Sequence, residues 1–149
     1  MEERMMALAL EQARLALAAG EIPVGAVIAR GDAVIAAAHN RRELDRDPTA
    51  HAEVVAIRQA ARALGGRRLT GCTLYVTLEP CPMCAGAIVM AGLSRVVYGA
   101  SDPQQGCTGS VYRITEDPAF SHFCPADGGV LAEECRALLE AFFRGAREK

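Results

Sequence analysis

The sequence has no hydrophobic run long enough to cross a membrane. Its longest apolar candidate, residues 85–93, is about half of the roughly 18 residues that a membrane-spanning helix needs. The first four residues are acidic overall, where a secretory signal would be basic and then hydrophobic. From both observations we expect a soluble protein of the cytoplasm that has no contact with a membrane.

An excess of positive charge is also missing. The 16 Lys and Arg residues are outnumbered by 18 Asp and Glu residues, which gives a formal net charge of −2. No global positive field therefore attracts nucleic acid, so DNA binding is not expected and any RNA contact must be local. Lys149 is the only lysine. The bias toward arginine suits forked phosphate contacts, but genome composition explains it as well.

Internal repeats, low-complexity tracts and linkers are absent, which favours a single domain over residues 1–149. A chain of this length buries roughly 70% of its unfolded surface, so its core needs no disulfides. Hydrophobic residues make up 51% of the chain and charged residues 23%. These values are typical of a globular protein and exclude a disordered or collagen-like chain.

Periodicity and turn residues predict helices that alternate with strands. Apolar residues recur at helical spacing near both ends, and β-rich runs lie between turn residues. The expected helices cover 2–19, 48–64, 82–92 and the last segment from about 131, and the expected strands cover 24–29, 33–38, 73–78 and 95–98. This order implies helices covering a mostly parallel sheet that opens with a hairpin. The ligand crevice of such a sheet lies where strands lead into helices.

The six cysteines are expected to be reduced thiols or metal ligands rather than disulfides, because no export is expected. Cys81 and Cys84 stand out as a Cys-x-x-Cys pair between prolines and small residues. The other cysteines are scattered and are interpreted as small buried hydrophobic residues: Cys72, Cys107, Cys124 and Cys135.

The cysteine pair gains meaning from His51 and Glu53, which lie near the start of another expected helix. One histidine with Cys81 and Cys84 supplies three zinc ligands, and no second Cys-x-x-Cys exists to complete a closed four-ligand site. Three protein ligands leave one coordination position open for water, as in catalytic zinc sites. Glu53 is then better placed as a proton shuttle than as a ligand, and helix N-termini favour the thiolate form of both cysteines.

The motifs His51-Ala52-Glu53 and Pro80-Cys81-Pro82-Met83-Cys84 resemble the signature of the zinc-dependent nucleobase deaminase superfamily. The resemblance spans nearly the whole chain, and residues 77–81, 95–100 and 106–110 look most like the bacterial tRNA-specific adenosine deaminases. It implies a cytidine-deaminase-like fold, a three-layer α/β/α sandwich with a mixed, mostly parallel five-stranded sheet. It also implies a homodimer with one zinc ion per subunit.

The reaction that this resemblance implies is hydrolytic deamination of the wobble adenosine, position 34, in an arginine tRNA anticodon, which gives inosine. The anticodon stem-loop would be the partner. Water activated by the zinc would attack C6 of the flipped adenine, and Glu53 would carry protons to the ring nitrogen and the leaving amine.

The resemblance also implies substrate contacts. Asn40 matches a base-contacting asparagine, although it could instead form a turn. The backbone N–H groups near Ala52 would touch the base, and Asp102 lies in a loop that the family places beside the flanking nucleotides. Phe143 could stack on a splayed base or pack in the core.

Phosphate contacts are less clearly marked in the sequence. The loop 41–47 carries three positive and three negative side chains, so we interpret it as a solvated loop. The better candidates are Arg67, Arg68, Arg144, Arg147 and Lys149.

Other functions fit parts of the pattern. A deaminase of free guanine, cytosine or a nucleotide would share the zinc chemistry and differ only at the mouth of the pocket. A non-catalytic zinc-stabilised binding module would need a fourth protein ligand, for which His39, Cys72 and His122 are available. A thiol redox protein would use the cysteine pair without the histidine and glutamate.

One segment departs from the family pattern. Residues 122–129 fall where the family usually has a final aliphatic strand, yet they include Pro125. Proline has no N–H to donate to a sheet, so we expect this strand to be short, shifted or at an edge.

Overall fold

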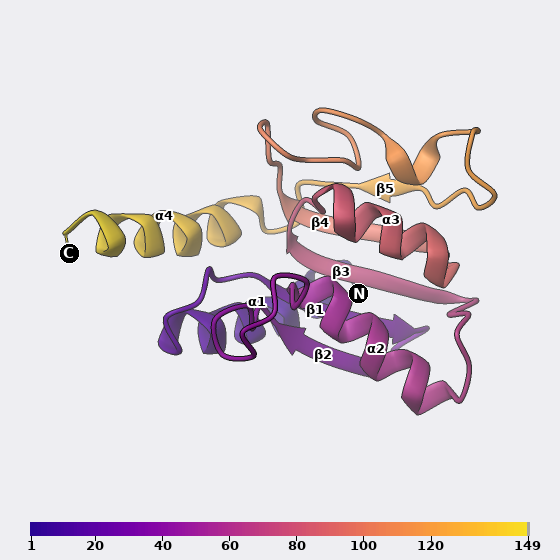
Figure 1. Ribbon diagram of the computed structural model, residues 1–149, viewed down its shortest axis with the longest axis horizontal. Coiled ribbons are helices and arrows are strands. Elements are labelled where there is room, and N and C mark those ends of the chain that lie inside the picture. Colours follow the sequence, from indigo (N-terminus) through magenta and orange to yellow (C-terminus); the bar gives the residue numbers. More distant parts are fainter. Residues whose placement is uncertain (149) are drawn as a thin grey trace.

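The computed structural model describes residues 1–148, with the side chains of residues 1–145. This part of the chain forms helices and strands in the expected alternating order (Figure 1). The elements are α1 (Glu2–Ala18), β1 (Gly25–Arg30), β2 (Ala33–His39), α2 (Ala52–Leu64), β3 (Cys72–Leu78), α3 (Pro82–Ala91), β4 (Arg95–Ala100), the short 3₁₀ helix η1 (Ile114–Glu116), β5 (Ala126–Asp127) and α4 (Ala132–Glu148). None of the described helices combines the length and apolar character needed to cross a bilayer.

The strands form one mixed sheet in the order β2-β1-β3-β4-β5. β1 pairs antiparallel with β2 and with β3, whereas β3 with β4 and β4 with β5 pair in parallel. Four strands therefore run in one direction and β1 runs in the other. The expected sheet, mostly parallel and opened by a hairpin, is confirmed. The hairpin turns at Gly31, whose φ of 62° lies in the left-handed region that glycine adopts without strain.

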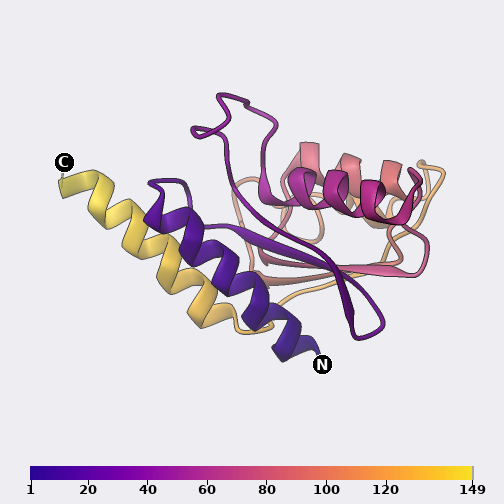
Figure 2. The same ribbon diagram turned by 90° about the horizontal axis from the view of Figure 1, so that it is seen from below.

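Helices cover both faces of the sheet. Figure 2 shows α1 and α4 side by side on one face, with α2 and α3 on the other. Val27 and Val97 of the central strands belong to the core under α1, while their neighbours Ile28 and Val96 belong to the core under α2 and α3. Successive strand residues point to opposite faces, so these strands are apolar throughout. Because both faces are covered, a ligand can approach the strands only at their ends.

The start of α2 differs from the expectation. We expected a helix from Pro48 capped by Asp47, but α2 begins at Ala52 with His51 as its N-cap in an extended conformation. The Asp47 side chain accepts hydrogen bonds from the backbone N–H and the hydroxyl of Thr49, at 2.8 and 2.7 Å. This local turn competes with helix formation and holds residues 47–50 outside the helix. The helix end is as expected, at Gly65 with a φ of 73°.

The final strand is short and lies at the edge of the sheet, as expected from Pro125. β5 has two residues, Ala126 and Asp127, which pair with Val96 and Val97 of β4. Pro125 takes part through its carbonyl oxygen, which accepts from the backbone N–H of Val96 at 2.9 Å. An acceptor role is the only one open to a proline in a sheet.

Gly25 at the start of β1 packs directly beneath α1, and replacing it with alanine is expected to destabilise the fold. A Cβ on Gly25 would lie 1.9 Å from the carbonyl oxygen of Ala9 and 2.6 Å from the amide nitrogen of Ala13. Both are backbone atoms, so relief requires α1 to move off the sheet. We expect Gly25→Ala to lower the free energy of unfolding by about 3 kcal/mol, measured by urea denaturation.

Gly66 provides the matched control, because a Cβ there would meet nothing within 4 Å. Gly66→Ala is expected to change the free energy of unfolding by less than about 1 kcal/mol. Equal stabilities for the two variants would show that α1 does not press on Gly25 in the folded protein.

Candidate metal and active site

The carboxyl ends of β2, β3 and β4 meet the first turns of α2 and α3 at one edge of the sheet. The three strands run in the same direction, and they end at His39, Leu78 and Ala100. His51 is the N-cap of α2, and Cys81 is the N-cap of α3. The structure thus brings the expected metal ligands to the expected crevice, where strands lead into helices.

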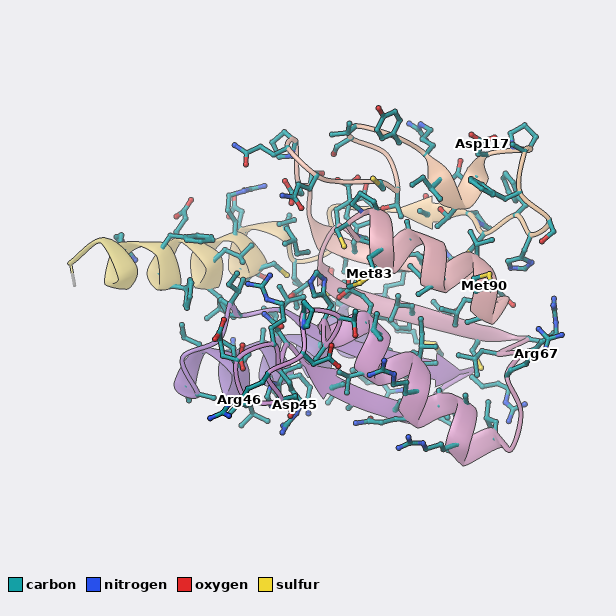
Figure 3. The ribbon with its side chains drawn as sticks, in the orientation of Figure 1. Asp45, Arg46, Arg67, Met83, Met90 and Asp117 are labelled. Carbon is teal, nitrogen blue, oxygen red and sulfur yellow. The ribbon has the colours of Figure 1, made fainter. Side chains whose placement is uncertain are left out.

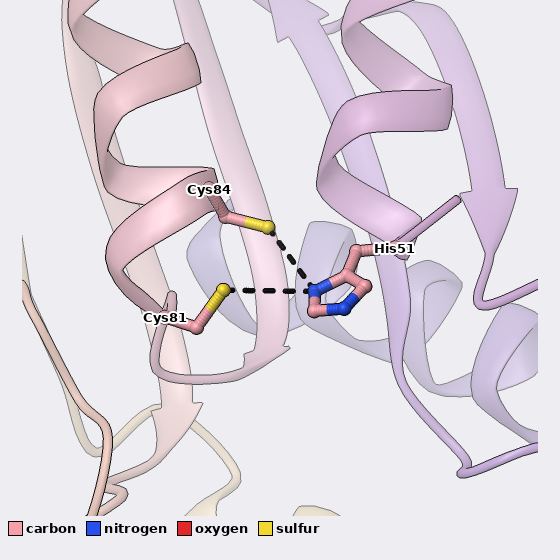
Figure 4. A group of neighbouring side chains, drawn as sticks. All are labelled: His51, Cys81 and Cys84. Carbon is pink, nitrogen blue, oxygen red and sulfur yellow. Dashed lines mark hydrogen bonds between the residues drawn. The ribbon is translucent and has the colours of Figure 1, made fainter. Parts of the chain in front are cut away.

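His51, Cys81 and Cys84 form one compact cluster of ligand atoms (Figure 4). The Nδ1 atom of His51 lies 3.6 Å from Sγ of Cys81 and 3.4 Å from Sγ of Cys84. A tetrahedral zinc ion with Zn–S of about 2.3 Å and Zn–N of about 2.0–2.1 Å places nitrogen and sulfur roughly 3.6 Å apart. The three side chains therefore fit one zinc ion.

The thiols of the cluster differ in their tendency to ionise. The hydrogen bond from the Cys84 thiol lowers the pKa of Cys81 to about 4, and the same contact, together with burial, raises the pKa of Cys84. The hydrogen bond with Cys81 raises the pKa of His51. One sulfur is thus a thiolate already, and binding a divalent cation displaces the remaining proton.

A fourth protein ligand is not found among the described residues. The only group of histidine, cysteine and carboxylate side chains there that could hold a metal consists of the three residues above. His39 Nδ1 lies 2.8 Å from the carbonyl oxygen of Asn40, and His122 Nε2 lies close to that of Leu93. The Cys72 thiol faces the carbonyl oxygen of Thr70. The site therefore has the open position of a catalytic zinc centre rather than the closed set of a structural one.

Glu53 lies beside the metal cluster without belonging to it. It occupies the first turn of α2, and its side chain is 4% exposed. Burial away from water raises the pKa of Glu53 to about 7. A carboxyl group with such a pKa can both accept and donate a proton near neutral pH, which is what a proton shuttle requires.

A cleft of about 430 Å³ opens directly over this site. Its lining includes all four residues that we considered as substrate contacts: Asn40, Ala52, Asp102 and Phe143. A cleft of this size is typical of small-molecule and cofactor sites. His51, Glu53 and Cys81 line the same cleft. Ala52 lies between the first two, whereas Asn40, Asp102 and Phe143 come from other segments of the chain.

The side chain of Asn40 is fixed by two hydrogen bonds. Its Nδ2 donates to the carbonyl oxygen of Ile22 at 3.2 Å, and its Oδ1 accepts from the backbone N–H of Arg42 at 3.3 Å. The second bond is the turn that we considered for Asn40. An amide side chain offers two donors and two acceptor positions, so one of each is left for a ligand. The turn and the contact with a base are therefore compatible.

Phe143 and Asp102 also line the cleft. Phe143 on α4 is 47% exposed and meets the ring of Phe142 edge-on, with centroids 5.3 Å apart. Such exposure is unlike core packing. The side chain of Asp102 accepts from the backbone N–H groups of Gln104 and Gln105, which shapes the loop after β4.

The loop 41–47 is not simply solvated, which corrects our interpretation. Arg42 lines the cleft, whereas Arg41 is paired with Asp45 at 3.0 Å. The buried carboxylate of Glu21, 1% exposed, accepts from the backbone N–H groups of Glu43 and Leu44 at 3.1 and 2.7 Å. Glu21 thereby fastens this loop against the rim of the cleft.

Glu79, between β3 and Cys81, is a second buried carboxylate that sequence reasoning missed. It is 2% exposed and accepts hydrogen bonds from the loop after β4. One sequence signal could have identified Glu21 and Glu79 as buried: each is an acidic residue directly before an apolar or metal-ligand motif. Acidic side chains are almost never fully buried unless they have partners.

The proposed phosphate contacts are mostly remote from the cleft. Arg67 follows the C-terminal end of α2, far from the loop that carries Asp45 and Arg46 (Figure 3). Arg68 lies near Gly92 at the C-terminal end of α3, where a cation is favourable for the helix dipole. Arg144 follows Phe143 on α4 and is exposed. The side chain of Arg147 and the whole of Lys149 lie outside the described residues.

Comparison with known proteins agrees with this site. A family model described as MafB19-like deaminase matches residues 1–119. A tRNA-specific adenosine deaminase of Bacillus subtilis is 47% identical over 148 residues, which cover 99% of this chain and 92% of the relative.

Solved structures confirm the cytidine-deaminase-like fold. One, from a study of A-to-I editing by tRNA:A34 deaminases at the wobble position of transfer RNA, superposes with a TM-score of 0.88 and 44% identity, over 91% of this chain and 99% of its own. A guanine deaminase from Nitrosomonas europaea superposes with a TM-score of 0.82 and 26% identity, over 94% and 83%. With three side chains that fit one zinc ion and a match along nearly the full length of such a relative, the chain belongs to the tRNA-specific adenosine deaminase family.

Proposed function

We propose that the protein deaminates adenosine to inosine at the wobble position, position 34, of a tRNA anticodon, with an arginine tRNA as substrate. One juxtaposition carries this proposal. Glu53 lies buried beside His51, Cys81 and Cys84 and lines an open cleft, in a chain 47% identical to a tRNA-specific adenosine deaminase. The cytoplasm, where tRNA is found, is then the expected location.

The proposed chemistry divides between the metal and Glu53. Zinc held by His51, Cys81 and Cys84 would lower the pKa of water to about 7 and so supply a nucleophile for C6 of adenine. The Glu53 carboxylate accepts a proton from the attacking water and delivers it to N1 of the base. It then takes the second proton of the former water from the hydroxyl at C6 and transfers it to the exocyclic amine, which leaves as ammonia while the C6 carbonyl forms. Adenosine and water thus give inosine and ammonia, and Glu53 returns to its starting form.

Two groups hold the base in this proposal. The free donor and acceptor positions of Asn40 meet polar atoms of the nucleotide, because its other two positions are taken by the protein. Ala52 begins α2, and the first N–H groups of a helix have no partner within it. Ala52 lines the cleft, so its N–H can donate to the base.

The mouth of the cleft favours a nucleotide extruded from an RNA loop. Asp102 and Phe143 lie where flanking nucleotides would pass, and an exposed aromatic ring on α4 can stack on an unpaired base. Arg42 adds a cation to the same rim, within reach of a phosphate.

The experiment is to incubate the zinc-loaded protein with an anticodon stem-loop of arginine tRNA and, separately, with free guanine, cytosine and adenosine. We expect inosine at one position of the RNA. Xanthine from guanine, with no inosine in the RNA, would show instead that the substrate is a free base. A stem-loop with guanosine at position 34 is the control for RNA that lacks the target base.

A homodimer is the proposed assembly, and the outer surface of α3 supports it. An apolar hollow there is lined by Gly86, Val89, Met90, Ile114 and Phe120. Met90 is 77% exposed and Phe120 is 49% exposed, which is unusual for large apolar side chains that lie together. A second copy of the chain would cover this surface.

Met90→Glu is expected to convert the dimer into a monomer, because it would place a charge in the centre of the apolar interface. Analytical ultracentrifugation would then give the 15.8 kDa mass of one chain, where the unchanged protein gives twice that mass. Leu15→Glu is the matched control, since Leu15 is 54% exposed on α1, on the other face of the sheet. A dimer that survives Met90→Glu would place the interface elsewhere.

A further inference from the structure

Glu79 forms a dense set of hydrogen bonds with the loop that follows β4. Its Oε1 accepts from the backbone N–H of Asp102 at 3.0 Å, and its Oε2 accepts from those of Thr108 and Ser110 at 3.3 and 2.8 Å. The hydroxyl of Ser110 donates to Oε1 as well. No ion pair of Glu79 is present in the described part of the chain, so backbone N–H groups and one hydroxyl stabilise this buried carboxylate.

The loop is shaped to close around Glu79. A Cβ on Gly106 would lie 2.3 Å from Cδ of Glu79 and 2.5 Å from the carbonyl oxygen of Asp102, so only glycine fits there. The backbone N–H of Cys107 donates to the carbonyl oxygen of Pro80 at 2.8 Å. The loop is therefore attached to the same short segment that carries the metal ligand Cys81.

The other side of this loop faces the cleft. Ser101, Asp102, Gln104 and Gln105 all line it. The first hydrogen-bond partner of Glu79, the N–H of Asp102, belongs to one of these lining residues. A shift of the loop would therefore change the wall of the cleft that these four residues form.

We propose that Glu79 is a positioning residue for RNA binding, which sets the place of loop 101–110 relative to the metal site. The inference rests on the proposed function, in which this loop meets the nucleotides beside the target adenosine. Glu79 touches neither the base nor the metal. Its effect therefore falls on the affinity for RNA and leaves the chemical step unchanged.

Glu79→Gln is the principal test, since it keeps the size of the side chain and removes half of its acceptors. The amide NH₂ must face at least one backbone N–H, which turns a hydrogen bond into a repulsive contact. We expect KM for the anticodon stem-loop to rise about tenfold or more, while kcat at saturating RNA stays within about twofold. Zinc content is expected to remain at one ion per chain.

Glu116→Gln is the matched control. Glu116 also accepts from a backbone N–H, that of Ala126 at 2.9 Å, but it lies on η1 away from the cleft. Its replacement is expected to leave KM and kcat unchanged. A second variant, Ser110→Ala, removes only the hydroxyl donor to Glu79, and we expect a rise in KM of about threefold with unchanged kcat.

Amide hydrogen exchange provides a readout that does not depend on any substrate. In Glu79→Gln, the N–H groups of Asp102, Thr108 and Ser110 are expected to exchange at least about tenfold faster than in the unchanged protein. Should Glu79→Gln fail to fold, the same two measurements on Ser110→Ala decide the question.

Two results would overturn the positioning role. They are an unchanged KM, with or without a loss of kcat, and loss of zinc from Glu79→Gln. If the unchanged protein forms no inosine in RNA, the proposed function is wrong, and so is the role of Glu79 in RNA binding. The exchange rates then still tell whether Glu79 holds the loop.

Discussion

Glu53→Gln is expected to keep one zinc ion per chain and to lower kcat for inosine formation about 10³-fold. The amide has nearly the shape of the carboxyl group and fits the same buried place in the first turn of α2. It cannot accept the proton of the attacking water at any pH near neutrality. His51, Cys81 and Cys84 are untouched, so metal binding is preserved. Single-turnover inosine formation and metal analysis of the purified protein measure the two effects separately.

Glu3→Gln is the control for this variant. Glu3 also lies in the first turn of a helix, α1, but is exposed and remote from the cleft. It is expected to deaminate RNA at the unchanged rate. Turnover by Glu53→Gln above about a tenth of the unchanged rate would exclude Glu53 as the proton shuttle, because such a group contributes about 10²-fold at least.

Cys81→Ser is expected to remove both the metal and the activity. The serine hydroxyl does not ionise near neutral pH, so the negative ligand that Cys81 supplies is lost, and with it the tetrahedral set of donors. Without the metal, the attacking water returns to a pKa of roughly 15.7. We expect less than about a tenth of a zinc ion per chain and a kcat reduced at least about 10³-fold.

Cys124→Ser is the matched cysteine control. Cys124 is buried away from the cleft, and its thiol faces the carbonyl oxygen of Pro125, to which a serine hydroxyl can donate. This variant should retain zinc and activity. Activity that survives removal of the ion by a chelator would contradict the metal mechanism and favour thiol redox chemistry at Cys81 and Cys84.

Most elements of the fold could be predicted from local patterns. Glycines end α2 and α3 in the left-handed conformation, at Gly65 and Gly92, as their positions after apolar runs indicated. The start of α2 could not be predicted, because Asp47 and Pro48 form a good helix start as well as a good turn. The turn prevails because the aspartate bonds to Thr49, leaving His51 in an extended conformation at the N-cap.

The cluster of His51, Cys81 and Cys84 was predictable because the residue types and spacing of a zinc site are strongly restricted. The rest of the site depends on contacts between distant segments. Glu21 and Glu79 accept from backbone N–H groups 22 to 31 positions further along the chain, and no local pattern announces such partners. Arg42 was assigned to a solvated loop because the charges of loop 41–47 balance. The hydrogen bonds from this loop to Glu21 hold it at the cleft, which Arg42 lines.

The spacing of the three residues that could hold the metal has a consequence for the stability of the fold. His51 and Cys81 are 30 positions apart, and they belong to two helices that lie side by side on the sheet. An ion bound by both therefore acts as a crosslink that only the folded chain can form. Its binding energy adds to folding in proportion to the logarithm of the free zinc concentration. We therefore expect the free energy of unfolding to rise with the free zinc concentration.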